Sequence, residues 1–180
     1  MQYLTKEQII LAAEKIFRLF TQTCNTIDDL SFFQHPANKW SAAENVQHLV
    51  VSTNTTTLAY TLPSFVVRWV GGKPNRTSRS YEELVTKYKN KLAAGGKASA
   101  RFVPKTISNS YGREKLMEQW QRATTRFIAA LQNKTTETKL DDYLVKHPLL
   151  GRITLRELCY FTIYHTEHHL NTISNPHPKY

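Results

Sequence analysis

The sequence is poor in cysteine and has no long apolar segment, and each shortage narrows the class of protein that it encodes. Cys24 and Cys159 are its only cysteines. Two residues cannot form a disulfide framework, and because both lie among apolar residues we expect reduced thiols in a core. No segment approaches the roughly 20 uninterrupted apolar residues that span a bilayer, and the charged N-terminal run is atypical of a signal peptide. We therefore expect a cytoplasmic protein with no membrane association.

The chain also lacks a recognised nucleic-acid-binding motif, although its formal net charge is +10. Its lysines and arginines are dispersed, with some concentration from Arg68 to Lys105, and no alternation of aromatic and basic residues marks a single-strand groove. This distribution favours a solvated basic face and no specific nucleic-acid binding. There is no internal repeat and no low-complexity tract. A length of 180 residues with 41% apolar residues predicts one globular domain over residues 1–180.

Three capping boxes mark the beginnings of helices, whereas strand signals are few. In each box a Ser or Thr precedes a Glu or Gln by three residues, and the two side chains satisfy free N–H groups of the first turn. The boxes are Thr5 with Gln8, Ser41 with Glu44, and Ser80 with Glu83. Apolar residues at helical spacing follow each box, so every box predicts the start of an amphipathic helix.

The predicted elements are mostly helices joined by polar segments. The helices are residues 5 to the mid-twenties, 41 to about 59, 80 to about 95, a longer one with an apolar stripe from Leu116 to Leu131, and 154 to 173. A shorter helix is expected after Pro63. Loops are expected at residues 28–40, 71–80, 96–109 and 133–142. This pattern favours an all-α fold, an antiparallel four-helix bundle with one or two short helices in the middle.

A pair of histidines on the last predicted helix is the strongest functional signal. His165 and His169 are spaced i, i+4, which places both imidazoles on one helix face, about 6 Å apart along the axis. That separation lets both rings reach one transition-metal ion. His48 lies in another predicted helix and is the candidate third ligand. His168 is a rival to His169, because the i, i+3 spacing from His165 also shares a face.

Polar residues continue the histidine faces of both helices. They are Glu44, Asn45, His48, Ser52 and Thr55 on one helix, and Thr162, His165, His169 and Thr172 on the other. Two polar stripes inside an apolar bundle are costly unless they face each other, a ligand or water. Glu44, Asn45 and Ser52 are therefore candidates to support the ligands or to contact substrate.

A second interpretation makes these histidines ordinary core residues, hydrogen-bonded to neighbouring polar groups and holding no metal. The number and register of the histidines argue against it, because isolated core histidines rarely occur as a matched set. Three other histidines, His35, His147 and His177, adjoin prolines in loop-like sequence. We expect these three to be structural or exposed.

The chain also resembles the DinB-like family. Trp40, followed by a capped helix with Ser41 and His48, is similar to that family's second helix. Residues 147–173, HPLLGRITLRELCYFTIYHTEHHLNTI, match its C-terminal signature. In that signature a His-Pro-x-x-Gly segment precedes a helix with an HxxxH pair and an apolar residue beside the last histidine. The resemblance extends over nearly the whole chain in the order of its helices.

This resemblance implies a four-helix bundle in an up-down-down-up arrangement with a long crossover, and a homodimer. It also implies a divalent metal ion (zinc, nickel or iron) held by His48, His165 and His169, and it selects His169 over His168. Characterised relatives include transferases and isomerases that use low-molecular-weight thiols such as bacillithiol or mycothiol. Many other members have no assigned activity.

Three hypotheses about function follow. The leading one is a metal-dependent S-transferase that joins a bacillithiol-type thiol to an electrophile. Three imidazoles leave a metal position open, and a thiol bound there loses its proton because a cation stabilises the thiolate. A water bound there would be acidified in the same way, so the runner-up is a metal-dependent hydrolase. The third is a non-catalytic stress-response protein in which the metal only stabilises the bundle.

Overall fold

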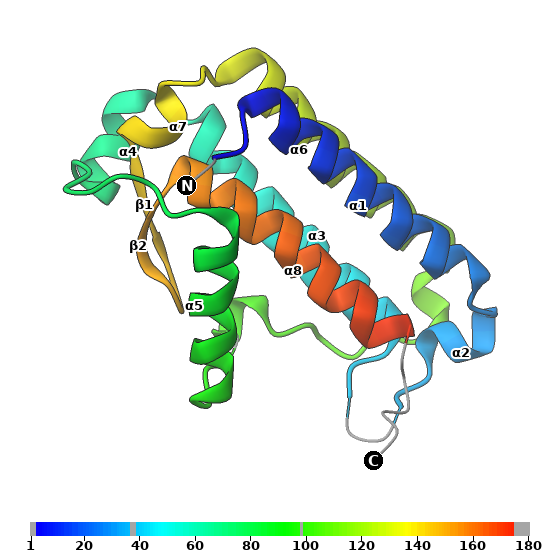
Figure 1. The fold of residues 1–180 in the computed structure, drawn as a ribbon. Helices are drawn as coiled ribbons and strands as arrows, with labels where there is room; N and C mark the ends of the chain where they lie inside the picture. The colour runs from blue at the N-terminus through cyan, green and yellow to red at the C-terminus, as the bar shows by residue number, and fades with distance from the viewer. Residues whose placement is uncertain (1–2, 37–38, 98, 175–180) are drawn as a thin grey trace.

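Four long helices form the body of the molecule in the computed structural model (Figure 1). They are α1 (Lys6–Thr26), α3 (Ala42–Thr61), α6 (Arg113–Lys134) and α8 (Leu155–Ser174). The structure describes residues 3–36, 39–97 and 99–174. α1 and α3 each contact both α6 and α8, so the four helices close around a shared interior. The expected all-α bundle is confirmed.

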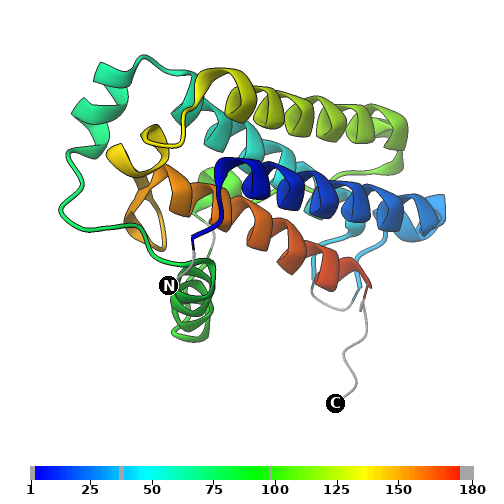
Figure 2. The ribbon, with the colours of Figure 1, turned by 45° about the horizontal axis from the view of Figure 1, so that its top comes forward.

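The directions of the four helices follow the up-down-down-up arrangement. α1 and α8 run one way, and α3 and α6 run the other way (Figures 1 and 2). Contacts between helix ends agree with this. The Tyr160 hydroxyl near the start of α8 accepts from the Leu4 N–H before α1 at 3.0 Å, as expected for parallel neighbours. Tyr60 near the end of α3 donates to the Leu155 carbonyl at the start of α8 at 3.0 Å, as expected for antiparallel neighbours.

A long crossover joins α3 to α6, and it lets these two adjacent helices run parallel. It contains α4 (Ser64–Gly71), α5 (Tyr81–Ala93) and two short 3₁₀ helices, η1 (Ala100–Phe102) and η2 (Asn109–Tyr111). α5 packs against α8 and stands apart from the other long helices in Figure 2. α4 ends against the segment that precedes α8. There Gly71 is required by close approach, because a Cβ would collide with the Leu144 carbonyl.

Two segments that were predicted to be loops contain short helices. α2 (Asp29–Phe33) lies within residues 28–40, and the Asp28 side chain caps it by accepting from the Ser31 N–H at 3.0 Å. α7 (Lys139–Asp142) lies within residues 133–142. Both helices are too short to show a full period of apolar residues, and the turn-forming residues around them dominate the sequence pattern. The loop prediction was therefore wrong at these two places.

A β-hairpin between α7 and α8 is the second departure from the sequence expectation. β1 (Leu144–His147) pairs antiparallel with β2 (Gly151–Thr154), with Val145 opposite Ile153. Four-residue strands give little alternation to detect, which is why the sequence indicated few strands. Gly151 adopts a φ of 75°, a conformation that favours glycine, where the hairpin turns into β2.

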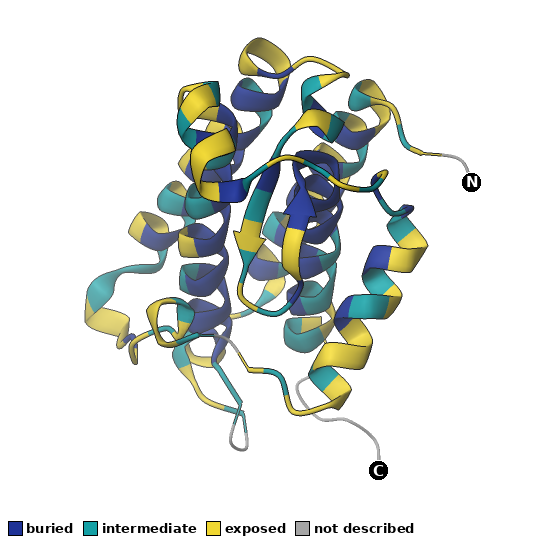
Figure 3. Cartoon of the chain, turned by 90° about the vertical axis from the view of Figure 1, so that its left-hand side faces the viewer, coloured by how far each residue is buried: buried dark blue, intermediate teal, exposed yellow. Residues whose placement is uncertain are grey.

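Buried aromatic residues pack between α1 and α6. Trp120 contacts Phe17 and Phe20 edge to face, at centroid distances of 5.3 and 5.2 Å, and its indole N–H donates to the Thr21 hydroxyl at 2.9 Å. Figure 3 shows buried and exposed residues alternating along the visible helices, as expected for amphipathic helices around a shared core. Such edge-to-face pairs add about 0.5–1.5 kcal/mol each beyond the area that they bury.

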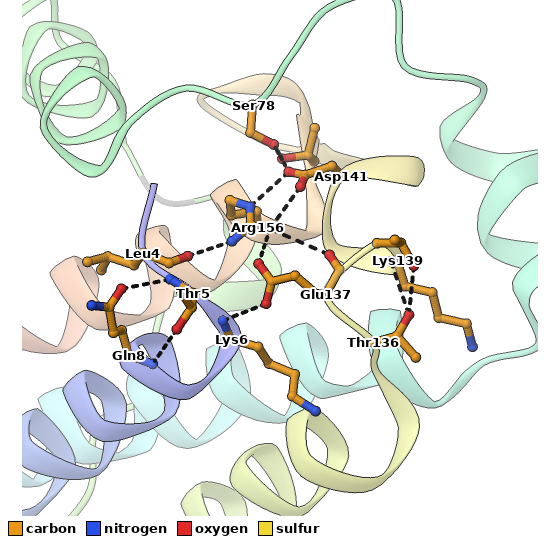
Figure 4. Close-up of polar contacts among 12 residues, drawn as sticks. Leu4, Thr5, Lys6, Gln8, Ser78, Thr136, Glu137, Lys139, Asp141 and Arg156 are labelled. Atoms are coloured by element: carbon orange, nitrogen blue, oxygen red, sulfur yellow. Dashed lines mark hydrogen bonds and ion pairs between the residues drawn. The ribbon is translucent and has the colours of Figure 1, made fainter. Parts of the chain in front are cut away.

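Arg156 ties the first turn of α8 to the start of α1 and to the segment around α7 (Figure 4). Its guanidinium donates to the Leu4 carbonyl at 2.6 Å, to Glu137 at 2.6 Å and to Asp141 at 2.8 and 2.9 Å. Arg156 is 3% exposed, so these partners replace the water that the cation loses on folding.

None of the described helices combines the length and the apolar character that spanning a bilayer requires.

Candidate metal centre

Three histidine side chains from two antiparallel helices meet between α3 and α8. His48 Nε2 lies 3.0 Å from His165 Nε2, and His169 Nε2 lies 3.1 Å from the same atom. Each of the three residues is no more than 6% exposed. The Ser41 capping box begins α3 and so sets the turn on which His48 lies. The structure thus brings together the three residues that the sequence predicted.

The outer nitrogens of two rings fix where their protons are. His48 Nδ1 lies 2.6 Å from the Phe102 carbonyl, which can only accept, so Nδ1 carries the proton. His169 Nδ1 lies 2.6 Å from Asn45 Oδ1. The amide nitrogen of Asn45 donates to the Ser41 carbonyl at 2.8 Å, which orients its oxygen toward the histidine. Both Nε2 atoms therefore present lone pairs to the centre of the cluster.

His165 completes a set of nitrogens that cannot all be hydrogen-bonded to one another. Its Nε2 faces both of those lone pairs, and a proton on it could be donated to only one of them. Its Nδ1 lies 3.4 Å from the Ser52 hydroxyl, a weak contact. A cation at the centre would satisfy all three nitrogens, which is the chemical reason to consider a metal.

The spacing of the nitrogens fits a divalent transition metal. Bonds of about 2.0–2.1 Å place two nitrogens about 2.9 Å apart at a right angle and about 3.4 Å apart in a tetrahedron. The separations of 3.0 and 3.1 Å lie within this interval. The potential ligand atoms of His48, His165 and His169 all lie within 4.8 Å of one another, so the group could hold a metal ion. No carboxylate belongs to this group among the described residues.

Burial keeps the cluster in the neutral form that binds metals. Burial lowers the pKa of His48 below its usual value. It lowers the pKa of His165 and His169 much further, and the neighbouring histidines add to the effect because two cations cannot share the site. Metal binding requires neutral imidazole, so near neutral pH no proton has to be displaced.

Aromatic rings wall the cluster on two sides. Trp40 stacks parallel to His169 at a centroid distance of 6.1 Å and lies 5.0 Å from His48. Phe161 stacks on His165 at 4.7 Å. These rings hold the imidazoles in place and keep water from most of the cluster, which strengthens electrostatic interactions there.

One side of the cluster is open to a cavity of about 590 Å³. His48, His165 and His169 all line this cavity, together with residues of α3, α4, α5, η1, β1 and the hairpin turn. Its volume lies in the range of about 300–1,000 Å³ that small-molecule sites usually have. A ligand in the cavity could therefore reach a metal held by the three histidines.

The other polar residues of the two stripes have mixed roles. Asn45 and Ser52 contact the cluster as expected, but Glu44 serves the helix cap, accepting from the Ser41 N–H at 2.9 Å. Thr55, Thr162 and Thr172 donate to carbonyls of their own helices. The polar stripes therefore overstate the size of the site.

The remaining described histidines lie in different surroundings: two of them line the cavity, and one is exposed. His168 lines the cavity and is not part of the three-histidine group. His147 also lines the cavity, and its Nδ1 accepts from the N–H groups of Leu149 and Leu150 at 3.2 and 3.1 Å, which shapes the hairpin turn. His35 is 48% exposed and lies 3.4 Å from Glu44. His177 lies outside the described residues.

Sequence reasoning missed one partner of the cluster, the Phe102 carbonyl. It lies in the segment that was predicted to be irregular, and it is a backbone atom. No side-chain pattern identifies such a partner. Trp40 and Phe161 were within the quoted motifs, but spacing alone does not assign their rings to the walls of the site.

The fold and the site together place the protein in the class of helical bundles that carry a buried three-histidine group between two antiparallel helices. A family model described as the DinB superfamily matches residues 13–173, and the chain belongs to this superfamily. The matched range contains all of α3 and all three histidines of the cluster, and it ends one residue before the end of α8. No curated protein matches the chain closely enough to be counted as a relative.

Proposed function

We propose that this protein is a metal-dependent enzyme whose divalent ion is held by His48, His165 and His169, and that it transfers a small-molecule thiol to an electrophile. One observation carries the proposal. The Nε2 atoms of His48 and His169 both lie within 3.1 Å of His165 Nε2, on the wall of a ligand-sized cavity. Zinc, nickel and iron all suit three imidazoles, so the proposal covers any of them.

Residues of the chain itself position the three imidazoles and shield them from water. A bound divalent ion would lower the pKa of a thiol in the open position and so favour the thiolate. The Phe102 carbonyl and Asn45 hold His48 and His169 in the tautomer with a free Nε2. Trp40 and Phe161 cover the rings on either side. These contacts fix the geometry before substrate binds, so little reorganisation is needed during reaction.

The thiol has to come from outside the chain. Burial raises the pKa of both Cys24 and Cys159 to about 12, so each stays protonated near neutral pH. Both cysteines are free, and neither lines the cavity. In the proposed reaction the external sulfur forms a bond to an electrophilic carbon, the leaving group departs with the electron pair of its bond, and the thiol proton passes to solvent.

The test is thiol conjugation by protein that was purified without a histidine tag and loaded with zinc, nickel or iron. Turnover of a panel of electrophiles with bacillithiol or another small thiol should fall at least about 100-fold in His165→Ala. His35→Ala is the matched control, because His35 is exposed and lies outside the cavity. Equal turnover in wild type and His165→Ala would contradict the proposal.

A hydrolase is the second candidate because the same open position could bind water. Its support is that the described lining residues of the cavity form no recognisable thiol-binding motif, whereas the hydroxyl-bearing residues Ser52 and Thr56 are among them. Hydrolysis of esters or amides without added thiol separates the two reactions. If chelation lowers the melting temperature and no substrate is turned over, the metal has only a structural role.

We also propose a cytoplasmic homodimer. The free, buried cysteines fit a reducing compartment. Phe65 and Trp69 on the outer side of α4 are 75% and 87% exposed, an apolar pair that a second copy could cover. Light scattering coupled to gel filtration should give twice the chain mass for wild type and a lower mass for Trp69→Glu. A monomeric wild type would contradict the dimer.

A further inference from the structure

The cavity beside the three histidines is walled mainly by apolar side chains away from the cluster. Leu58 of α3, Leu62 directly after α3 and Val70 of α4 line it and are 53%, 44% and 48% exposed. Leu144 and Val145 of β1 and Leu149 of the hairpin turn line it as well. Apolar side chains that face an open cavity gain free energy when an apolar ligand covers them.

The charges around the cavity are of one sign. Among its described lining residues there is no Asp and no Glu, whereas Arg101 and Lys146 both belong to it. Neither Arg101 nor Lys146 has a carboxylate within ion-pair distance in the described part of the chain. An anionic group would find a partner here, and a cationic group would not.

Arg101 lines the same cavity as the three histidines and precedes Phe102, which contacts His48. Its guanidinium lies 5.0 Å from the centroid of the Phe102 ring, and the Phe102 carbonyl lies 2.6 Å from His48 Nδ1. Ser99 also lines the cavity, and its hydroxyl oxygen is buried with no hydrogen-bond partner in the described structure. A buried hydroxyl without a partner costs free energy that a ligand oxygen could return.

We propose that the cavity binds an elongated apolar molecule that carries a single carboxylate or a similar anionic group. The anionic group lies at Arg101 and Ser99, near the three histidines, and the apolar part extends along α3 and α4 toward the hairpin. The proposal rests on the proposed function in taking the histidine wall as the reacting end. Binding itself needs no metal and can be measured without it.

Chain length is the first readout. If the tail enters the apolar part of the cavity, each added methylene strengthens binding by up to about fourfold until the space is filled. Calorimetry on chelated protein with hexanoate, octanoate and decanoate measures this directly. Decylamine, which has the same length and the opposite charge, should bind at least about tenfold more weakly than decanoate.

Two substitutions separate the apolar part from the anionic part. Ala59→Trp should fill the cavity beside Leu58 and weaken decanoate at least about tenfold, while Ala12→Trp, at a half-buried alanine of α1 outside the cavity, should not. Arg101→Gln should weaken decanoate and leave 1-decanol unchanged. Arg122→Gln on the exposed side of α6 is its control.

The outcomes distinguish this proposal from the proposed function. Weak binding of all three carboxylates with no dependence on length would overturn it, even if the metal-loaded protein turns over other substrates. Equal binding of decylamine and decanoate would overturn the charge assignment. If length and charge dependence both appear and the metal-loaded protein shows no turnover, the ligand class stands and the enzymatic proposal fails. Circular dichroism melting of each variant shows whether it is folded.

Discussion

Both halves of α8 bury polar side chains, but the two halves differ in the partners that these side chains have. Its first turn carries Arg156 and Glu157, which are 3% and 0% exposed. Both are fully partnered within the chain. Glu157 accepts from Arg76 at 2.7 and 2.8 Å and from the Thr154 N–H at 3.0 Å. Burial alone would raise the pKa of Glu157, yet these donors leave it below the usual value.

The second half of the same helix carries His165 and His169, which are also buried, at 6% exposed each, and whose Nε2 atoms lack such partners. Their Nε2 atoms face each other and that of His48, with no carboxylate in the group. The comparison shows that the fold can pair buried charge completely. At the cluster it instead gathers three like groups, which could hold a metal ion from outside the chain.

The largest expected effect is a loss of stability at the first turn of α8, where the buried charges are paired. Glu157→Ala leaves Arg76 and Arg79 facing a site without their carboxylate and should destabilise the fold by about 3–5 kcal/mol. Urea denaturation measures it. Asp142→Ala, at an exposed acidic residue nearby in sequence, should change stability by about 0.5 kcal/mol or less. A loss below about 1 kcal/mol for Glu157→Ala would contradict the pairing argument.

The second half of α8, which carries His165 and His169, should be stabilised by bound metal instead. Chelation of the loaded protein should remove about 2.7 kcal/mol of stability when the free metal had been at about 100 times its dissociation constant. The same treatment should leave His165→Ala unchanged, because that variant has lost a ligand. Calorimetric melting with and without chelator tests this. Equal shifts in both proteins would show that the metal binds elsewhere.

A smaller effect is expected from the residue that orients His169. Asn45→Ala removes the acceptor of the Nδ1 proton and should weaken metal binding about 10- to 100-fold without abolishing it. Competition with a colorimetric chelator gives the affinity. Asn54→Ala on the same helix is the control, and an affinity in Asn45→Ala equal to that of wild type would contradict the role of Asn45.

The weakest effect is the pH dependence of metal-free protein. The pKa values of His48, His165 and His169 are lowered in the fold, so the unfolded chain binds more protons below about pH 6.5. Their contribution to stability is complete above that pH and is lost as the pH falls toward the folded pKa values. The slope is at most about 1.4 kcal/mol per pH unit for each histidine. Urea titrations from pH 7.5 to 5.5 should show a shallower slope in His165→Ala, and identical slopes would contradict it.

The sequence predicted the parts of this fold that local chemistry determines. The three capping boxes at Thr5, Ser41 and Ser80 are all formed, so the beginnings of α1, α3 and α5 were predicted correctly. The spacing of His165 and His169 predicted a shared face for the same reason. His48 was a candidate third ligand from the residues alone, but spacing cannot show which helices are adjacent, so the grouping of His48 with His165 and His169, and the choice of His169 over His168, depended on the resemblance to a family.

Other features could not be predicted because they depend on tertiary contacts. The Phe102 carbonyl reaches His48 only after the crossover has folded across α3. The hairpin consists of two four-residue strands, which are too short to give a clear sequence pattern. The need for glycine at position 71 arises only from the close contact between α4 and the Leu144 carbonyl. The cavity is formed by segments that are distant in sequence, so no local pattern indicates its apolar wall.

The most direct test of the three-histidine centre is the metal content of tag-free protein after dialysis against zinc, nickel or iron. One ion per chain is expected in wild type and in His168→Ala, whose histidine adjoins His169 but lies outside the group. His48→Ala, His165→Ala and His169→Ala should each retain less than about a tenth of an ion per chain. A wild-type chain without metal, or a full ion in all three variants, would contradict the account.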